Sequence, residues 1–183
     1  MAPHAIQLLL DQVRYWGSDD AERAAVYPCD DLVPEPDEVL FRAVTVDATP
    51  PILFRWLCQL RLAPYSYDWI DNLGRRSPRH LSPGVEDLAV GQRVMTIFTL
   101  MAFETDRHLT LYTDHPLFGE IGGTYLVSPR GSQSRLVVKL RTRFPRSVRG
   151  VVMRRLLPAG DLVMMRKQLR TLGALAEASS RGD

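Results

Sequence analysis

The stretch GGTYLVSPRGSQSRLVVKLRTRF, residues 122–144, decides the fold class of this chain. Two runs rich in β-branched residues flank the tetrapeptide RGSQ at 130–133, whose glycine suits a tight turn. In the second run every other residue from Leu136 to Leu140 is aliphatic, and Lys139 and Arg141 alternate with them. The pattern predicts a β-hairpin with one buried face and one partly exposed face.

The residues on the N-terminal side of this hairpin continue the strand pattern. RVMTIFTLMAFE at 93–104 and HLTLYTD at 108–114 are separated by the polar residues 105–107, which predicts a second hairpin. VLFRAVTVDA at 39–48 is rich in β-branched and aromatic residues and predicts an earlier strand. A helix should follow, because Thr49 can cap it and prolines occupy its first positions.

The residues after Pro145 change to a helical period. Ser147 can cap a helix that runs to about Leu157, where Pro158 and Gly160 should interrupt it. Asp161 can then cap a second helix over 162–178. One apolar stripe of this second helix comprises Leu162, Met165, Leu169, Leu172 and Ala176.

The order of these elements argues for an α+β fold, with helices packed on an antiparallel sheet. A parallel α/β fold would need strands that alternate with helices, and residues 93–144 leave no room for them. At the N-terminus, Ile6, Leu9, Leu10 and Val13 predict a short amphipathic helix that ends near Gly17. The proline-rich acidic residues 17–38 should wrap irregularly over the surface.

The composition of the chain also limits the classes of protein to which it can belong. With 183 residues and 45% hydrophobic residues, the chain is expected to form one globular domain without a transmembrane helix or a secretory signal. Cys29 and Cys58 form no CxxC pair and are expected to be free thiols in a reducing cytoplasm.

Charge is distributed unevenly along the chain. Residues 1–40 carry nine acidic and two basic side chains, a net −7, whereas residues 139–170 carry ten basic and one acidic, a net +9. Either the acidic segment lies near the basic one, or the basic region meets an anionic ligand, a membrane surface or nucleic acid. Nucleic acid is disfavoured, because aliphatic residues and not stacking aromatics interleave with the bases.

Motifs for catalysis and cofactors are missing. The four histidines have no metal-binding spacing, and the sequence contains no GxSxG, GxGxxG or P-loop motif. We therefore expect no metal, no cofactor and no assignable catalytic residue. Asp114 with His115 is more typical of a solvated turn than of an acid–base pair.

The segment APYSYDWIDNLGRR, residues 63–76, concentrates aromatic side chains outside any clear period. Tyr65, Tyr67 and Trp69 alternate and would point the same way in an extended chain, either into the core or into a ligand cavity. Asp68 should accept backbone N–H bonds; the alternative is a buried acid or base with a raised pKa.

Three stretches carry a resemblance to a known superfamily: YPCDDLVPEPDEVLFRAVTVDATPPILFRWLCQL at 27–60, YSYDWIDNLG at 65–74 and GDLVMMRKQLRTLGALAE at 160–177. Together they resemble the START-like or SRPBCC superfamily of polyketide cyclase-like and lipid-transport-like proteins, over roughly residues 18–178. The resemblance implies a helix-grip fold, in which a curved antiparallel sheet wraps around a long C-terminal helix with a cavity between them. It divides the chain into an N-terminal helix and acidic segment (1–38), the helix-grip domain (39–178) and a disordered tail (179–183).

The leading hypothesis is that the chain binds a hydrophobic small molecule, such as a lipid, polyketide or isoprenoid, in this cavity. The expected ligand contacts are Trp56, Tyr65, Tyr67, Asp68, Trp69, Phe98, Met101, Met153 and Met165. The alternatives are a cyclase or dehydratase, with Tyr65, Tyr67, Asp68 or His108 as its polar group, and a ligand-free interaction protein. Peripheral membrane contact through the basic C-terminal region is a further expectation, and the chain could be a monomer or a homodimer.

Overall fold

A computed structural model describes residues 11–71 and 74–182 of the chain. In this part, seven strands form one sheet in the order β1-β2-β7-β6-β5-β4-β3, antiparallel except for β1 and β2. The strands are β1 (Tyr15–Trp16), β2 (Glu38–Val46), β3 (Arg93–Val94), β4 (Phe98–Glu104), β5 (His108–His115), β6 (Gly119–Arg130) and β7 (Gln133–Arg143). The two expected hairpins are β4–β5 and β6–β7, and the strand expected at 39–48 is β2.

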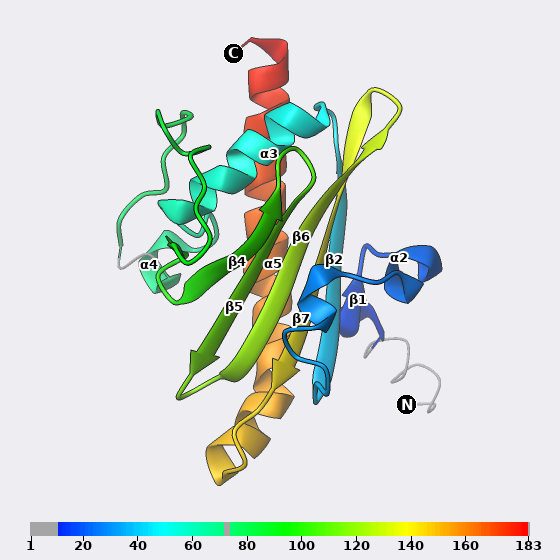
Figure 1. The fold of residues 1–183 in the computed structure, drawn as a ribbon, viewed down its shortest axis with the longest axis vertical. Coiled ribbons are helices and arrows are strands. Elements are labelled where there is room, and N and C mark those ends of the chain that lie inside the picture. Colours follow the sequence, from blue (N-terminus) through cyan, green and yellow to red (C-terminus); the bar gives the residue numbers. More distant parts are fainter. Residues whose placement is uncertain (1–10, 72–73, 183) are drawn as a thin grey trace.

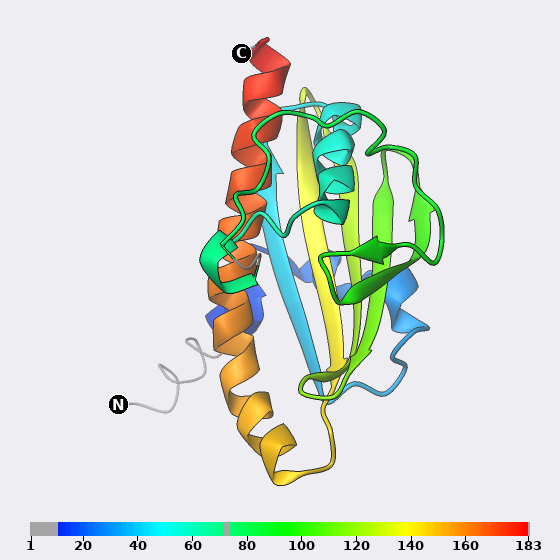
Figure 2. The same cartoon turned by 90° about the vertical axis from the view of Figure 1, so that its left-hand side faces the viewer.

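The helices lie mainly on one face of this sheet. The long helix α5 (Val148–Arg181) runs along that face, and α3 (Pro50–Cys58) crosses it near its C-terminal end (Figures 1 and 2). The shorter elements are α2 (Asp20–Ala24), α4 (Asp68–Asp71) and the 3-10 turns η1 (Pro28–Asp30) and η2 (Gln59–Arg61). A curved sheet that holds a long C-terminal helix is the helix-grip arrangement, so the expected α+β fold class is confirmed.

The main core fills the space between the sheet and these helices. Leu136 and Val138 of β7 meet Leu169 and Leu172 of α5 in this core, as the alternation of β7 and the apolar stripe of α5 predict. Trp56 of α3 is only 2% exposed and closes the core near the C-terminal end of α5. Burial of these aliphatic and aromatic side chains is the main force that holds α5 to the sheet.

The N-terminal segment covers the opposite face of the sheet. Tyr27 and Cys29 pack there on Phe41 and Val137 in a second, smaller core. The sequence predicted a partly exposed face on β7, but Lys139 of that face is only 6% exposed because this segment lies over it. The helix expected from Ile6 to Val13 lies largely outside the described residues.

Ion pairs join this acidic segment to β7. The Nζ of Lys139 lies 2.6 Å from Oδ1 of Asp30, and Arg141 shares the same carboxylate at 3.1 Å. Arg135 pairs with Glu22 at 2.7 Å. The acidic segment therefore lies over the β7 part of the basic region, which was one of the two alternatives that the charge distribution left open.

One prediction about α5 is wrong. The helix continues through Pro158 without a break, and Asp161 is an interior residue of it and not the cap of a second helix. Proline removes one backbone hydrogen bond and normally interrupts a helix, but tertiary contacts can override that preference. Here Arg42 of β2 donates to the carbonyl oxygen of Pro158 at 3.3 Å and to Asp161 at 3.0 Å, which fixes both residues against the sheet.

The C-terminal end differs from expectation in a similar way. Residues 179–181 belong to α5, although a disordered tail was expected at 179–183. The indole Nε1 of Trp56 donates to the hydroxyl of Ser179 at 3.0 Å, so α3 holds this last turn in place.

Candidate functional site

The aromatic segment after α3 has a bent backbone. Tyr65 adopts a left-handed conformation with φ of +57°, which is uncommon for a residue other than glycine, and α4 begins three residues later. The expectation that Tyr65, Tyr67 and Trp69 point the same way is therefore wrong. Tyr65 is 1% exposed, Tyr67 is half-buried and Trp69 is 75% exposed.

Tyr65 forms the inner end of this segment. Its hydroxyl accepts a hydrogen bond from Nε2 of Gln59 at 3.0 Å, and its ring meets the Trp56 ring edge-on at 6.3 Å. Burial raises the pKa of Tyr65 to about 12, so its hydroxyl stays protonated at neutral pH. Tyr65 is thus a fixed, neutral side chain at the boundary between core and surface.

A cleft of about 470 Å³ lies between this segment and α5. We call it the Tyr65 cleft; it is lined by Tyr65, Ser66, Asp68, Ser77, Arg79, Lys167, Arg170, Thr171, Ala174 and Leu175. The volume falls in the usual range for small-molecule sites, roughly 300–1,000 Å³. The cleft is open to solvent, and its lining combines apolar side chains with charged ones, which we call its rim.

The rim of the Tyr65 cleft is mainly cationic. It carries Arg79, Lys167 and Arg170 against the single carboxylate of Asp68. None of the ion pairs among the described side chains involves these three cations, although Arg170 lies over the Trp16 ring at 5.7 Å. An anionic group would be attracted to this rim.

Asp68 holds the loop that forms one wall of the cleft. Its two carboxylate oxygens accept hydrogen bonds from the backbone N–H of Ser77 at 2.9 Å and from the Ser77 hydroxyl at 2.5 Å. Its carbonyl oxygen accepts from the N–H of Gly74 at 2.8 Å. Asp68 thus accepts backbone N–H bonds, as the sequence suggested, and positions the residues around Ser77.

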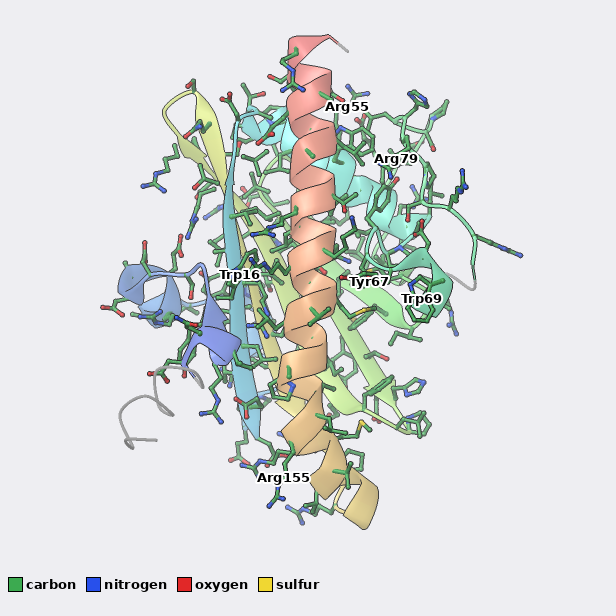
Figure 3. All side chains as sticks on the ribbon, turned by 180° about the vertical axis from the view of Figure 1, so that it is seen from behind. Trp16, Arg55, Tyr67, Trp69, Arg79 and Arg155 are labelled. Carbon is green, nitrogen blue, oxygen red and sulfur yellow. The ribbon has the colours of Figure 1, made fainter. Side chains whose placement is uncertain are left out.

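A second cleft of about 470 Å³ lies on the other flank of α5, against the edge of the sheet. This Trp16 cleft is lined by Trp16, Gly17, Ala43, Val44, Thr45, Val46, Arg135, Leu169, Arg170, Gly173, Ala174 and Glu177. Arg170 and Ala174 border both clefts, and Figure 3 shows Trp16 on one side of α5 with Tyr67 and Arg79 on the other. In the Trp16 cleft, Arg135 is already paired with Glu22, so this cleft has less unpaired charge than the Tyr65 cleft.

The nine residues expected to contact a ligand are not gathered in one place. Tyr65 and Asp68 line the Tyr65 cleft, and the other seven line neither cleft. Trp56 and Met165 are buried in the core, Phe98, Met153 and Tyr67 are half-buried, and Met101 and Trp69 are exposed.

Two buried polar pairs at the interface of sheet and helix were missed by the sequence reasoning. Arg42 is fully buried and pairs with Asp161 at 2.8 Å; burial raises the pKa of Asp161 to about 6, while Arg42 opposes that rise. The Tyr125 hydroxyl donates to Gln168 at 2.7 Å, and burial raises the pKa of Tyr125. The sequence did contain a signal for the first pair, because Arg42 is a charged residue inside the apolar run of β2.

Gln168 also connects α5 to the aromatic segment. Its Nε2 donates to the carbonyl oxygen of Pro64 at 2.6 Å, one residue before Tyr65. The amide thus fixes the distance between the two walls of the Tyr65 cleft at its inner end.

Among residues 11–71 and 74–182, no cluster of three or more His, Cys, Asp or Glu side chains could hold a metal ion. Within the same residues, no helix combines the length and the apolar character that crossing a bilayer requires.

Comparisons with known proteins show similarity of fold. No protein-family model matches the chain, and no curated protein matches it. The hypothetical protein jhp0584 from Helicobacter pylori is 14% identical with a TM-score of 0.54, covering 84% of this chain and 96% of that one. Protein CV1439 from Chromobacterium violaceum is 13% identical with a TM-score of 0.50, covering 76% and 96%.

A weaker likeness is to StfQ, a di-domain ARO/CYC from the steffimycin biosynthetic pathway. It is 14% identical with a TM-score of 0.45, and the match covers 78% of this chain and 51% of that one. The first two comparisons show that these two bacterial proteins have a similar fold to this chain. At such identities they carry no information about a ligand or a reaction.

Proposed function

We propose that this protein binds an amphipathic small molecule, with a hydrophobic body and an anionic group, in the Tyr65 cleft. The observation that carries the proposal is the lining of the cleft, in which three cations without carboxylate partners occur together with Tyr65, Ala174 and Leu175. The leading hypothesis from the sequence was a hydrophobic ligand in a cavity between the sheet and the C-terminal helix. The core fills that space, so the proposed site is instead an open cleft beside α5, and the anionic group is added because of the cations that line it.

The cleft has walls that favour binding of a ligand without a large rearrangement. Asp68 fixes one wall through Ser77, and Gln168 fixes the spacing of the walls through Pro64. A site whose walls are held before the ligand arrives loses less conformational entropy on binding. The left-handed backbone at Tyr65 supports the same proposal, since such conformations concentrate at ligand-binding positions.

Binding is favoured over catalysis by the state of the polar groups. Both oxygens of Asp68 accept hydrogen bonds from Ser77, and Tyr65 has a pKa raised to about 12, far from that of a general acid or base at neutral pH. The cyclase or dehydratase alternative has no comparable observation in its support.

The test compares two ligands of one length, decanoate and decanol, by isothermal titration and thermal shift. Decanoate should bind and raise the melting temperature, and decanol should bind at least about tenfold more weakly, because charged hydrogen bonds contribute roughly 1.5–3 kcal/mol. Lys167→Met should remove most of this preference for the carboxylate.

Arg166→Met is the matched control. Arg166 is an exposed cation on the same helix that lies over the Trp16 ring and does not line the Tyr65 cleft, so its loss should leave the preference intact. Equal binding of decanoate and decanol, or an equal effect of both variants, would contradict the proposal.

A further inference from the structure

The first half of α5 carries an exposed aliphatic patch. Val151, Val152, Leu156 and Val163 are 61%, 46%, 60% and 54% exposed, and we call these four residues the α5 patch. Val152, Leu156 and Val163 are spaced by four and seven residues, which places them on one side of the helix.

This placement is unusual for a surface helix. In a surface helix, the apolar residues normally form the stripe that packs on the core, and the side that faces solvent is polar. The second half of α5 follows this rule, with Leu169 and Leu172 fully buried and Lys167 exposed. Contiguous exposed aliphatic side chains mark a surface that meets something other than water.

The α5 segment that carries most of the α5 patch is rich in arginine. Residues 145–160 contain four arginines and no acidic residue. Arg154 lies 3.6 Å from Asp37 in an exposed ion pair, and Arg155 has no carboxylate partner among the described side chains. Arg155 projects from the helix near its N-terminal end (Figure 3).

One more exposed aliphatic residue, Leu117, lies at the same end of the molecule. The β5–β6 connection, residues 116–118, is at the end where α5 begins (Figures 1 and 2), and its Leu117 is 48% exposed. This end thus presents aliphatic side chains from two elements that are far apart in the sequence.

We propose that this end of the protein docks on an anionic lipid bilayer through the α5 patch, with Arg155 near the headgroups. The occupant follows from the combination of side chains: aliphatic residues that protrude from a helix can enter the boundary between headgroups and acyl chains, and arginines beside them attract anionic lipid. An acidic protein partner would match the arginines but would not require four protruding aliphatic residues among them. This inference does not depend on the Tyr65 cleft.

Flotation of the full chain with vesicles tests the inference. The protein should float with phosphatidylcholine vesicles that contain about a third phosphatidylglycerol, should stay in solution with pure phosphatidylcholine vesicles, and should dissociate as salt is raised. The variant Arg155→Gln should lower the partition coefficient about fivefold, because an arginine near an anionic surface contributes roughly that factor.

Aliphatic insertion is tested separately from charge. Leu156→Asp should abolish flotation, and the milder Leu156→Ala should reduce it. Val26→Asp is the matched control, because Val26 is 89% exposed on the N-terminal segment and lies outside the patch. Circular dichroism of each variant checks that the fold is kept.

Two outcomes would overturn the inference. One is a wild-type chain that fails to float with anionic vesicles at low salt. The other is unchanged flotation of both Leu156 variants; if Leu156→Asp then converts a dimer to a monomer in sedimentation, the α5 patch joins two copies of the chain instead.

Discussion

At the scale of single residues, the molecule depends on a few charged side chains buried where the sequence pattern predicts apolar ones. Arg42 is the clearest example, since it lies inside the β2 run and reaches α5 beneath the sheet. It donates to the carboxylate of Asp161 and to the carbonyl oxygens of Pro158 and Arg14. A buried ion pair is weak evidence for net stability, but removing one partner leaves an uncompensated charge in the core.

Arg42→Met should therefore lower the free energy of unfolding by about 3–5 kcal/mol in urea denaturation. The double variant Arg42→Met with Asp161→Leu should recover much of that loss, because neither charge is then buried alone. Arg107→Met is the control: Arg107 pairs with Glu104 at an exposed site, and its loss should cost less than about 1 kcal/mol. If the double variant is no more stable than Arg42→Met alone, the unpaired charge of Asp161 is not the cause of the lost stability.

At the scale of elements, α5 shows how tertiary contacts override local preference. Pro158 removes a backbone donor in the middle of the 34-residue helix, and the sequence accordingly predicted two helices. The helix remains continuous because it is fixed on both sides of the proline: Leu157 packs against the core on one side, and Asp161 is bound to Arg42 on the other.

Pro158→Ala should stabilise the protein by about 1–3 kcal/mol, since alanine restores the missing donor and favours the helix. The rise in melting temperature of the variant measures this stabilisation. Gly160→Ala is a matched control on the same helix, where an added Cβ meets no atom within 4 Å, and it should gain about 1 kcal/mol. A destabilised Pro158→Ala would indicate that the proline sets the path of the helix on the sheet.

At the scale of the whole molecule, the sheet is covered on both faces by segments from opposite ends of the chain. The helix α5 lies on one face, and the acidic N-terminal segment lies on the other with Asp30 bound to Lys139 and Arg141. Lys139 is buried beneath this cover and lies over the Tyr27 and Phe41 rings. We therefore expect the N-terminal segment to unfold cooperatively with the sheet.

Asp30→Asn tests that cooperativity. The substitution leaves the buried Lys139 without its carboxylate and should lower the free energy of unfolding by about 3 kcal/mol, in one transition. Asp31→Asn, at the exposed neighbouring position, should have almost no effect. Two separate transitions in Asp30→Asn, with the later one unshifted, would show instead that the segment unfolds independently.

The sequence by itself determined the longer strands β2 and β4 to β7, the two hairpins and the buried stripe of α5, because these follow from the period of apolar residues over short windows. It did not determine the short strand β1, since Tyr15 and Trp16 lie where a helix was expected to end. The alternation in β7 and the spacing of Leu169, Leu172 and Ala176 depend only on residues that are close in the sequence. The α+β class then follows from the order of the predicted helices and strands. The resemblance to the helix-grip proteins agreed with this order and with the resulting fold.

Only the tertiary structure decided where the candidate site lies. The Tyr65 cleft joins residues about a hundred positions apart, from Tyr65 and Arg79 to Lys167 and Arg170, and no local period encodes such a meeting. The left-handed backbone at Tyr65 turned Trp69 outward, and Arg42 kept α5 continuous through Pro158. Local patterns specify which residues can be buried, whereas long-range packing fixes which of them meet and which side chains remain free to bind a ligand.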